Sequence, residues 1–220
     1  MVKVETHLHT AESSPCGKVK AAEGIAACKA AGYDAVVVTD HFCDILEDLP
    51  GSPRERAERF LDGYLYAKEA GEKLGVHVLF AVEARLPGGP EDILFYGVTP
   101  QFILENPLFY THPLPEAYSA LHEIGALVVQ AHPFRERCRP LDPRFLDGVE
   151  IFNTHPRHES HNRLALRFAE KYNIPIRTSG SDFHQLPDVG RGGMLFDVLP
   201  ADERAFCDAL IAGNGILIHP

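Results

Sequence analysis

The stretch Glu5-Thr6-His7-Leu8-His9-Thr10, near the start of the sequence, decides how the rest of the chain is interpreted. Its two histidines, His7 and His9, are two positions apart in a short apolar run. In a β-strand, residues at this spacing point to the same face, so both imidazole rings would converge on one point. Imidazole is the commonest protein ligand for transition metals. The stretch alone still permits a strand whose histidines only face solvent.

The size and charge of the chain limit what it can be. Its 220 residues are 45% hydrophobic, which suffices for a buried core. We expect a single domain over residues 1–220, because α/β barrels commonly reach this size undivided. The formal net charge of −10 argues against an extended nucleic-acid track and against binding to anionic membranes. It is compatible with an anionic substrate, because bound cations can invert the local potential.

The cysteines and the apolar runs indicate the compartment. Five cysteines are odd in number and widely spaced, and no Cys-x-x-Cys pair occurs, which is typical of reduced thiols rather than of a disulfide framework. No apolar run approaches the length of a membrane span, and Lys3, Glu5 and His7 interrupt what would be the core of a signal peptide. We therefore expect a cytoplasmic protein without a membrane partner.

Short apolar runs alternate with longer amphipathic segments, a rhythm that favours βα units. Segment 99–115 carries four prolines and is expected to be irregular. The predicted strands are 2–9, 35–38, 77–82, 92–98, 127–130, 149–152, 176–179 and 216–218, and the predicted helices are 21–31, 53–74, 116–124, 160–172 and 201–212.

Residues of metal-ligand type follow the predicted strands where each one ends. In β/α barrels the active site lies at the carboxyl ends of the strands, so we expect these side chains to meet. A carboxylate can bridge two cations while neutral imidazoles fill the remaining positions, so the set predicts a cluster of divalent ions. Asp40 and His41 would face opposite ways on a strand, so we expect His41 to ligate and Asp40 to orient it. The full set is His7 and His9 after the first strand, Asp40 and His41 after the second, Glu83 after the third, His132 after 127–130, and Asp182 and His184 after 176–179.

Five stretches, in order along the chain, resemble the motifs of the PHP family, named for polymerase and histidinol phosphatase. They are 6–10 (THLHT), 38–41 (VTDH), 82–83 (VE), 130–133 (QAHP) and 180–184 (GSDFH). The resemblance implies an α/β fold, a distorted (β/α)7 barrel of the PHP type, with two or three divalent ions of zinc, manganese or iron. By this likeness, one ion is held by His7, His9, Glu83 and Asp182, a second by Glu83 and His132, and a third by His41 and His184.

Two positions depart from the pattern of many PHP proteins. Relatives often carry a histidine in the loop after the first motif, where this chain has Cys16, and another on the strand after Glu83, where Asp92 falls nearest. Cys16 is predicted as a thiolate ligand, with a small buried loop cysteine as the alternative. Asp92 is predicted as an oxygen ligand, with an exposed aspartate at a strand start as the alternative.

These features predict a metal-dependent hydrolase, a phosphoesterase or phosphatase, that acts on a small phosphorylated molecule. We expect a hydroxide that bridges two ions to attack phosphorus, with Asp182 or His184 assisting proton transfer. Arg135 and Arg191 each lie close in sequence to a predicted ligand and are expected to bind the phosphate. Of the remaining histidines, we place only His155 near the metals. Two alternatives stay open: a nuclease that acts on oligonucleotide ends, and a non-catalytic metal-containing binding or regulatory module.

Overall fold

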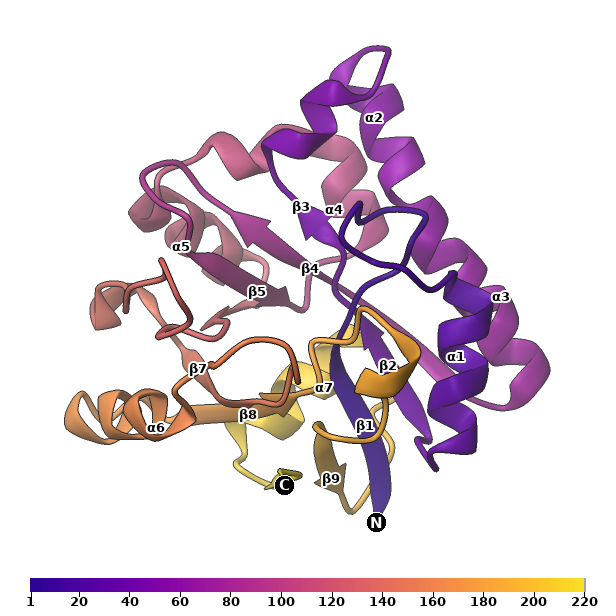
Figure 1. The fold of residues 1–220 in the computed structure, drawn as a ribbon. Helices are drawn as coiled ribbons and strands as arrows, with labels where there is room; N and C mark the ends of the chain where they lie inside the picture. Colours follow the sequence, from indigo (N-terminus) through magenta and orange to yellow (C-terminus); the bar gives the residue numbers. More distant parts are fainter. Residues whose placement is uncertain (220) are drawn as a thin grey trace.

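The computed structural model describes residues 1–219, and its centre is a sheet rolled into a nearly closed, distorted barrel (Figure 1). β5 runs antiparallel to both of its neighbours, whereas the other neighbouring barrel strands are parallel. The barrel closes where Leu8 bridges to Phe183, beyond the end of the last strand. This confirms the distorted (β/α)7 barrel. Its strands, in sheet order, are β1 (Val2–Leu8), β2 (Ala35–Val38), β4 (His77–Arg85), β5 (Asp92–Tyr96), β6 (Leu127–Gln130), β7 (Gly148–Asn153) and β8 (Ile176–Gly180).

Short strands extend the barrel at two places. β9 (Met194–Phe196) pairs antiparallel with the first half of β1, and β10 (Ile216–Leu217) pairs with β9. β3 (His41–Phe42) pairs with the end of β4, which places His41 opposite Glu83. The sequence predicted β10 but neither β3 nor β9, because strands of two or three residues are too short to show an alternating pattern.

Helices cover the outside of the barrel and close one end of it (Figure 1). At that end Phe206 of α7 contacts Tyr96 of β5 edge-on, with ring centroids 5.2 Å apart. Segment 99–115 is less irregular than expected, because Thr99 caps a short helix by accepting a hydrogen bond from the N–H of Phe102 (3.1 Å). No helix within residues 1–219 is long and apolar enough to cross a membrane. The α-helices are α1 (Ala21–Ala30), α2 (Pro53–Phe60), α3 (Asp62–Leu74), α4 (Pro100–Glu105), α5 (Leu114–Glu123), α6 (Asn162–Lys171) and α7 (Glu203–Ile211), and the 3-10 helices are η1 (Asp44–Asp48), η2 (Phe109–Thr111), η3 (Pro143–Phe145) and η4 (Leu186–Asp188).

The predicted helix 53–74 is two helices, α2 and α3, and a side chain from another segment causes the break. The hydroxyl of Ser13 donates to the carbonyl of Phe60 (2.6 Å) and accepts from the N–H of Gly63 (2.9 Å). A side chain inserted into the hydrogen-bond ladder in this way interrupts a helix. Gly63 also allows α3 to lie against the loop after β1, since a Cβ there would overlap Thr10 Oγ1 and lie 2.7 Å from Asp40 Oδ2.

The side chains of β4 show how the barrel leads into a polar site. Val78, Phe80 and Val82 belong to the apolar cluster under the outer helices, whereas Leu79 and Ala81 belong to the cluster inside the barrel. Because successive strand residues point to opposite faces, the next inward-facing side chain is the buried carboxylate of Glu83. The apolar interior therefore ends, and the polar centre begins, at the carboxyl end of this strand.

Candidate metal centre

Glu83 is surrounded by four histidines that come from β1 and the residue just after it, from β3, and from the segment after β6. Its Oε1 atom lies 3.2 Å from His7 Nε2 and 3.1 Å from His132 Nε2. Its Oε2 atom lies 3.3 Å from His9 Nε2 and 3.1 Å from His41 Nδ1. The carboxylate thus presents one oxygen to each of two pairs of imidazole rings, as a carboxylate that bridges two cations would do.

Asp182, just beyond β8, forms a compact set with His7 and His9. Its Oδ1 atom lies 3.4 Å from the Nε2 atom of each histidine, and the two Nε2 atoms are 3.1 Å apart. Donor atoms about 2.1 Å from a shared ion are about 3.0 Å apart at a right angle and about 3.4 Å apart in a tetrahedron. The observed separations, including those to Glu83, therefore fit donors arranged around one cation.

A second group adjoins this set on the side of His9. The rings of His41 and His184 have centroids 4.6 Å and 4.4 Å from that of His9. One ligand atom from each of these three histidines and the thiol of Cys16 all lie within 4.8 Å of one another. Cys16 is exposed at the rim of the site, so the alternative of a small buried loop cysteine does not describe it.

A third group lies on the other side of Glu83. One ligand atom each from Asp92, His132 and Cys138 lies within 4.8 Å of the others. Asp92 is buried rather than exposed, and its Oδ1 atom lies 2.7 Å from Arg85 Nη2, so it already has a cationic partner. Cys138 was not among the ligands predicted from the sequence. Cys138 and Arg144 have the Cys-x5-Arg spacing of cysteine phosphatases, but Arg144 is exposed and ion-paired within its own turn.

Two of the predicted ligands have an unusual backbone conformation. His132 has φ 27° and Asp182 has φ 50°, values that residues other than glycine rarely adopt. Such conformations cost about 1–3 kcal/mol each and persist where the surroundings enforce them. Next to Asp182, the fully buried carboxylate of Glu5 accepts hydrogen bonds from the N–H (2.9 Å) and the hydroxyl of Ser181. Glu5 therefore fixes the backbone next to Asp182.

The surroundings of His7 and His9 stabilise positive charge, whereas burial lowers the pKa of His41 to about 3 and that of His184 to about 4. Burial lowers the pKa of His9, but its contacts with Asp182 and Glu83 outweigh burial and raise this pKa to about 9. Burial also lowers the pKa of His7, and the charges of Glu150, Asp182 and Glu83 raise it well above the usual value. A site that favours charged imidazole also favours a divalent cation in place of the protons. The donor set and its charge therefore fit divalent metal ions.

Glu150, on β7, was not predicted to be a site residue, although it contacts two predicted ligands. Its Oε1 atom lies 2.9 Å from His7 Nδ1. Its Oε2 atom accepts from the N–H of His132 (3.2 Å) and from Nδ2 of Asn153 (2.9 Å). The contact with Nδ1 directs the Nε2 atom of His7 at the centre. One signal was present, since Glu150 is the only charged residue in the run 149–152, and a buried strand carries such a group only with partners.

Asp40 orients a different histidine from the one expected. Its carboxylate accepts from the N–H (2.7 Å) and hydroxyl (2.7 Å) of Thr10 and from the hydroxyl of Ser14 (2.6 Å). Ser14 Oγ lies 3.3 Å from His9 Nδ1 and accepts from the backbone N–H of His41 (3.0 Å). Asp40 therefore holds Ser14, and Ser14 in turn contacts the ring of His9 and the backbone N–H of His41. Neither residue orients the ring of His41.

Of the two arginines predicted to bind phosphate, the structure brings Arg135 to the centre. Its Nη2 atom donates to Asp182 Oδ2 (2.5 Å) and to Asn153 Oδ1 (2.8 Å). Arg191 is exposed and is not among the residues that line the cavity described below. His155 offers a ring nitrogen within 4.8 Å of an Asp182 oxygen, which places it near the centre as expected.

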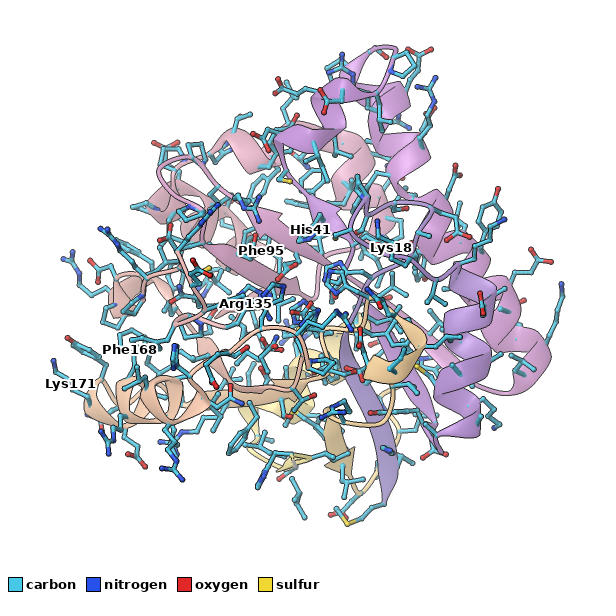
Figure 2. The ribbon with its side chains drawn as sticks, viewed as in Figure 1. Lys18, His41, Phe95, Arg135, Phe168 and Lys171 are labelled. Atoms are coloured by element: carbon cyan, nitrogen blue, oxygen red, sulfur yellow. The ribbon has the colours of Figure 1, made fainter. Side chains whose placement is uncertain are left out.

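The centre opens into a cavity of about 320 Å³ at the carboxyl ends of the strands. Figure 2 shows His41 and Arg135 near the middle of the molecule, although they are far apart in the sequence. Ligand pockets in proteins range from about 300 to 1,000 Å³, so this cavity suits a small molecule. It is lined by Cys16, His41, Glu83, Arg85, Pro90, Asp92, His132, Arg135, Glu136, Arg137, Cys138, Asp182 and His184.

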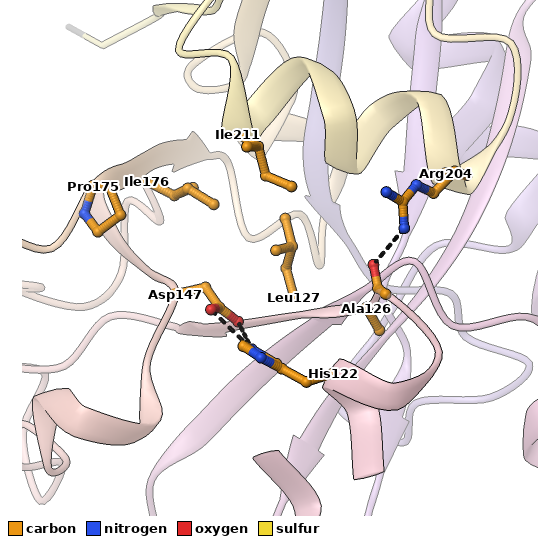
Figure 3. A pocket seen from close by; sticks show the side chains of 9 residues that line it. His122, Ala126, Leu127, Asp147, Pro175, Ile176, Arg204 and Ile211 are labelled. Atoms are coloured by element: carbon orange, nitrogen blue, oxygen red, sulfur yellow. Dashed lines mark hydrogen bonds and ion pairs between the residues drawn. The ribbon is translucent and has the colours of Figure 1, made fainter. Parts of the chain in front are cut away.

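Another cavity, of about 370 Å³, lies at the opposite end of the barrel (Figure 3). Leu127 and Ile176, the first residues of β6 and β8, line it together with Arg204 of α7. His122 Nε2 lies 3.0 Å from a carboxylate oxygen of Asp147 at its wall. No predicted site residue is among its lining residues in the described chain.

Comparisons with known proteins agree with this architecture. Residues 159–214 match a family described as PHP-associated. The chain is also similar to the structure of a two-domain protein from Bacteroides vulgatus that contains a predicted PHP-like metal-dependent phosphoesterase, with 17% identity and a TM-score of 0.70. Residues 159–214 thus match the PHP-associated family, and the whole chain shares its fold with the Bacteroides structure.

Two further similarities cover different shares of this chain. PsfC from Pseudomonas syringae is 16% identical with a TM-score of 0.69, over 100% of this chain and 91% of that one. An uncharacterised protein of Methanocaldococcus jannaschii is 32% identical over 113 residues, which are 44% of this chain and 47% of that protein. The match thus spans about half the length of this curated relative. The match to the Bacteroides protein covers 99% of this chain and 64% of that one.

Proposed function

We propose that this protein is a metal-dependent phosphoesterase of the PHP family that hydrolyses a phosphoester in a small phosphorylated molecule. The observation that carries the proposal is the set of histidines around Glu83, which opens into a cavity beside the Arg135 guanidinium. The similarity in fold to the Bacteroides protein, which contains a predicted PHP-like metal-dependent phosphoesterase, supports the same class of reaction.

The donor atoms suggest where divalent ions of zinc, manganese or iron would be held. The separations among His7, His9, Glu83 and Asp182 suit one ion, while Glu83 and His132 suit a second. When bound, such ions lower the pKa of a coordinated water and offset negative charge on phosphoryl oxygens.

Arg135 is the residue best placed to bind a phosphoryl oxygen. Its Nη2 atom is held by Asp182 and Asn153, which fixes the plane of the guanidinium. Its buried Nε atom has no hydrogen-bond partner among residues 1–219. Guanidinium donors bind phosphate oxygens with charge-assisted hydrogen bonds, so an anion in the cavity would satisfy this side chain.

The two residues considered for proton transfer differ in their suitability. Burial raises the pKa of Asp182, but His7 and Arg135 outweigh burial and hold it well below its usual range. Asp182 is therefore suited to holding a cation and poorly suited to donating a proton. His184 lines the cavity, but its Nδ1 lies 2.8 Å from the carbonyl oxygen of Asp182, so only Nε2 remains, and that nitrogen cannot both hold a cation and carry a proton.

Hydrolysis by the purified protein tests the proposal. After stripping with a chelator, we expect activity on an aryl phosphate, sugar phosphates or mononucleotides only when manganese, zinc or iron is restored. His9→Ala should abolish it, and His122→Ala, at the opposite end of the barrel, should not. Metal-independent turnover, or full activity of the His9→Ala variant, contradicts the proposal. Turnover of short oligonucleotides alone would identify a nuclease, and metal binding without any turnover would identify a binding module.

A further inference from the structure

We infer that Cys16 supplies a thiolate ligand to a cation held together with His41 and His184, so that the centre contains one soft site beside its carboxylate-rich one. The inference deepens the proposed function because it rests on the same centre. It concerns which ions the centre takes, and metal binding tests it without any turnover.

The geometry singles out three donors. Ligand atoms of Cys16, His41 and His184 lie within 4.8 Å of one another and of one His9 nitrogen. The Nε2 atom of His9 is already 3.4 Å from Asp182 Oδ1, in the carboxylate-rich set, and its Nδ1 faces a hydroxyl. His9 therefore belongs to the neighbouring ion, and the other three residues remain for this one.

The loop that carries Cys16 is tied to both partner histidines. Two residues before it, the hydroxyl of Ser14 accepts from the backbone N–H of His41 (3.0 Å). Two residues after it, the N–H of Lys18 donates to the carbonyl of His184 (2.8 Å). Between them, Gly17 is packed so closely that a Cβ would lie 2.8 Å from a backbone oxygen. The thiol is thus positioned by the same segments that carry the two imidazoles.

The donor types set the preference for ions. Two imidazoles and one thiolate favour zinc, cobalt or iron(II) over magnesium and manganese, which prefer oxygen ligands. Two carboxylate oxygens lie nearby, Glu83 Oε2 at 3.1 Å from His41 Nδ1 and Asp182 Oδ1 at 3.3 Å from His184 Nδ1, and both also contact His9 of the neighbouring set. Three protein ligands with a remaining open position are typical of catalytic zinc sites. Because Cys16 and His184 line the cavity, a ligand in the cavity can reach that position.

Cobalt substitution of the chelator-stripped protein tests the inference directly. A thiolate bound to Co²⁺ gives a sulfur-to-metal charge-transfer band in the near ultraviolet, whereas imidazole and carboxylate ligands do not. We expect the band in the wild type, its loss in Cys16→Ser, and its retention in Cys138→Ser, the other cysteine at the cavity. Cys16→His should bind cobalt without the band, which separates the loss of the thiolate from a loss of folding.

The outcomes separate this inference from the proposed function. Absence of the band in the wild type overturns the inference, and so does a band that Cys138→Ser removes and Cys16→Ser keeps. Metal-dependent hydrolysis without the band leaves the proposed function intact and overturns the inference. A band that depends on Cys16, in a protein that hydrolyses no phosphoester, supports the inference and overturns the proposed function.

Discussion

Replacing Glu150 by glutamine tests whether the predicted ligands depend on buried partners behind them. The carboxylate lies 2.9 Å from His7 Nδ1, and it accepts from the N–H of His132 (3.2 Å) and from Asn153 Nδ2 (2.9 Å). In all three contacts, a carboxylate oxygen of Glu150 accepts the hydrogen bond. The Glu150→Gln variant keeps the size of the side chain but exchanges one acceptor oxygen for an NH2 donor.

Either orientation of the amide leaves one contact unmade. If the NH2 group faces His7, Nδ1 must accept, the ring proton moves to Nε2, and that nitrogen no longer binds a cation. If the NH2 group faces His132, two donors oppose each other in the interior, at a cost of about 1–3 kcal/mol. Since about 1.4 kcal/mol corresponds to a tenfold change in affinity, we expect zinc to bind about 10–100-fold more weakly.

Competition between the stripped protein and a chelating dye measures this affinity. Glu69→Gln is the matched control, because Glu69 is exposed on α3, paired with Lys73, and not among the residues that line the cavity. It makes the same chemical change and should leave the zinc affinity at the wild-type value. A Glu150→Gln variant that binds zinc as tightly as the wild type would refute the reasoning about His7.

Other perturbations probe the same centre. Gly180→Ala should lower the free energy of unfolding by about 1–3 kcal/mol, because the added Cβ would lie 2.5 Å from the Cβ of His7. Urea unfolding measures this, and an unchanged unfolding midpoint would show that the strands can shift to make room. Arg135→Lys should lower kcat/KM for the phosphoester with metal content unchanged, since a single ammonium cannot replace the fork of donors, and equal activity would contradict this role. In the stripped protein, burial lowers the pKa of His9, but its bonds to Asp182 and Glu83 outweigh burial and raise this pKa from 6.5 to about 9. Burial and Arg135 lower the pKa of His132, but its bonds to Cys138 and Glu83 outweigh them and raise it from 6.5 to about 10. The resulting stabilisation is complete below pH 6.5 and is lost as the pH rises to 9–10, so a free energy of unfolding that rises over this range would contradict it.

The residues of the centre that could be predicted from the sequence were those that lie at the ends of strands. His7, His9 and Glu83 lie at the ends of long strands whose apolar pattern is visible in the sequence, and parallel strand ends must meet. Arg135 and Arg191 show the limit of this reasoning. Both are close in sequence to a predicted ligand, but only Arg135 enters the cavity, because the path of each loop depends on contacts that no local pattern records.

The supporting residues were harder to find for a related reason. Strand alternation turns Glu150 toward the centre, since Val149 and Ile151 belong to the apolar cluster under the outer helices, but its partners His7 and His132 come from distant segments that the pattern of β7 does not reveal. The break between α2 and α3 depends on a serine of the first loop that is more than 45 residues away. Both features arise from packing between distant segments, whereas hydrophobic periodicity reports on one segment at a time.

The buried carboxylates connect the centre to the stability of the whole barrel. Glu83, Glu150 and Asp182 are almost entirely buried, and Arg135 is the one guanidinium bound directly to any of them within residues 1–219. Buried carboxylates without cationic partners are strongly destabilising, which explains why the pKa values of His7 and His9 beside them are raised. Cations that replace those protons bind the folded chain alone, because the donors come from segments spread over most of the sequence. Binding and folding are therefore linked, so the ions that suit the proposed reaction also stabilise the strained backbone at His132 and Asp182.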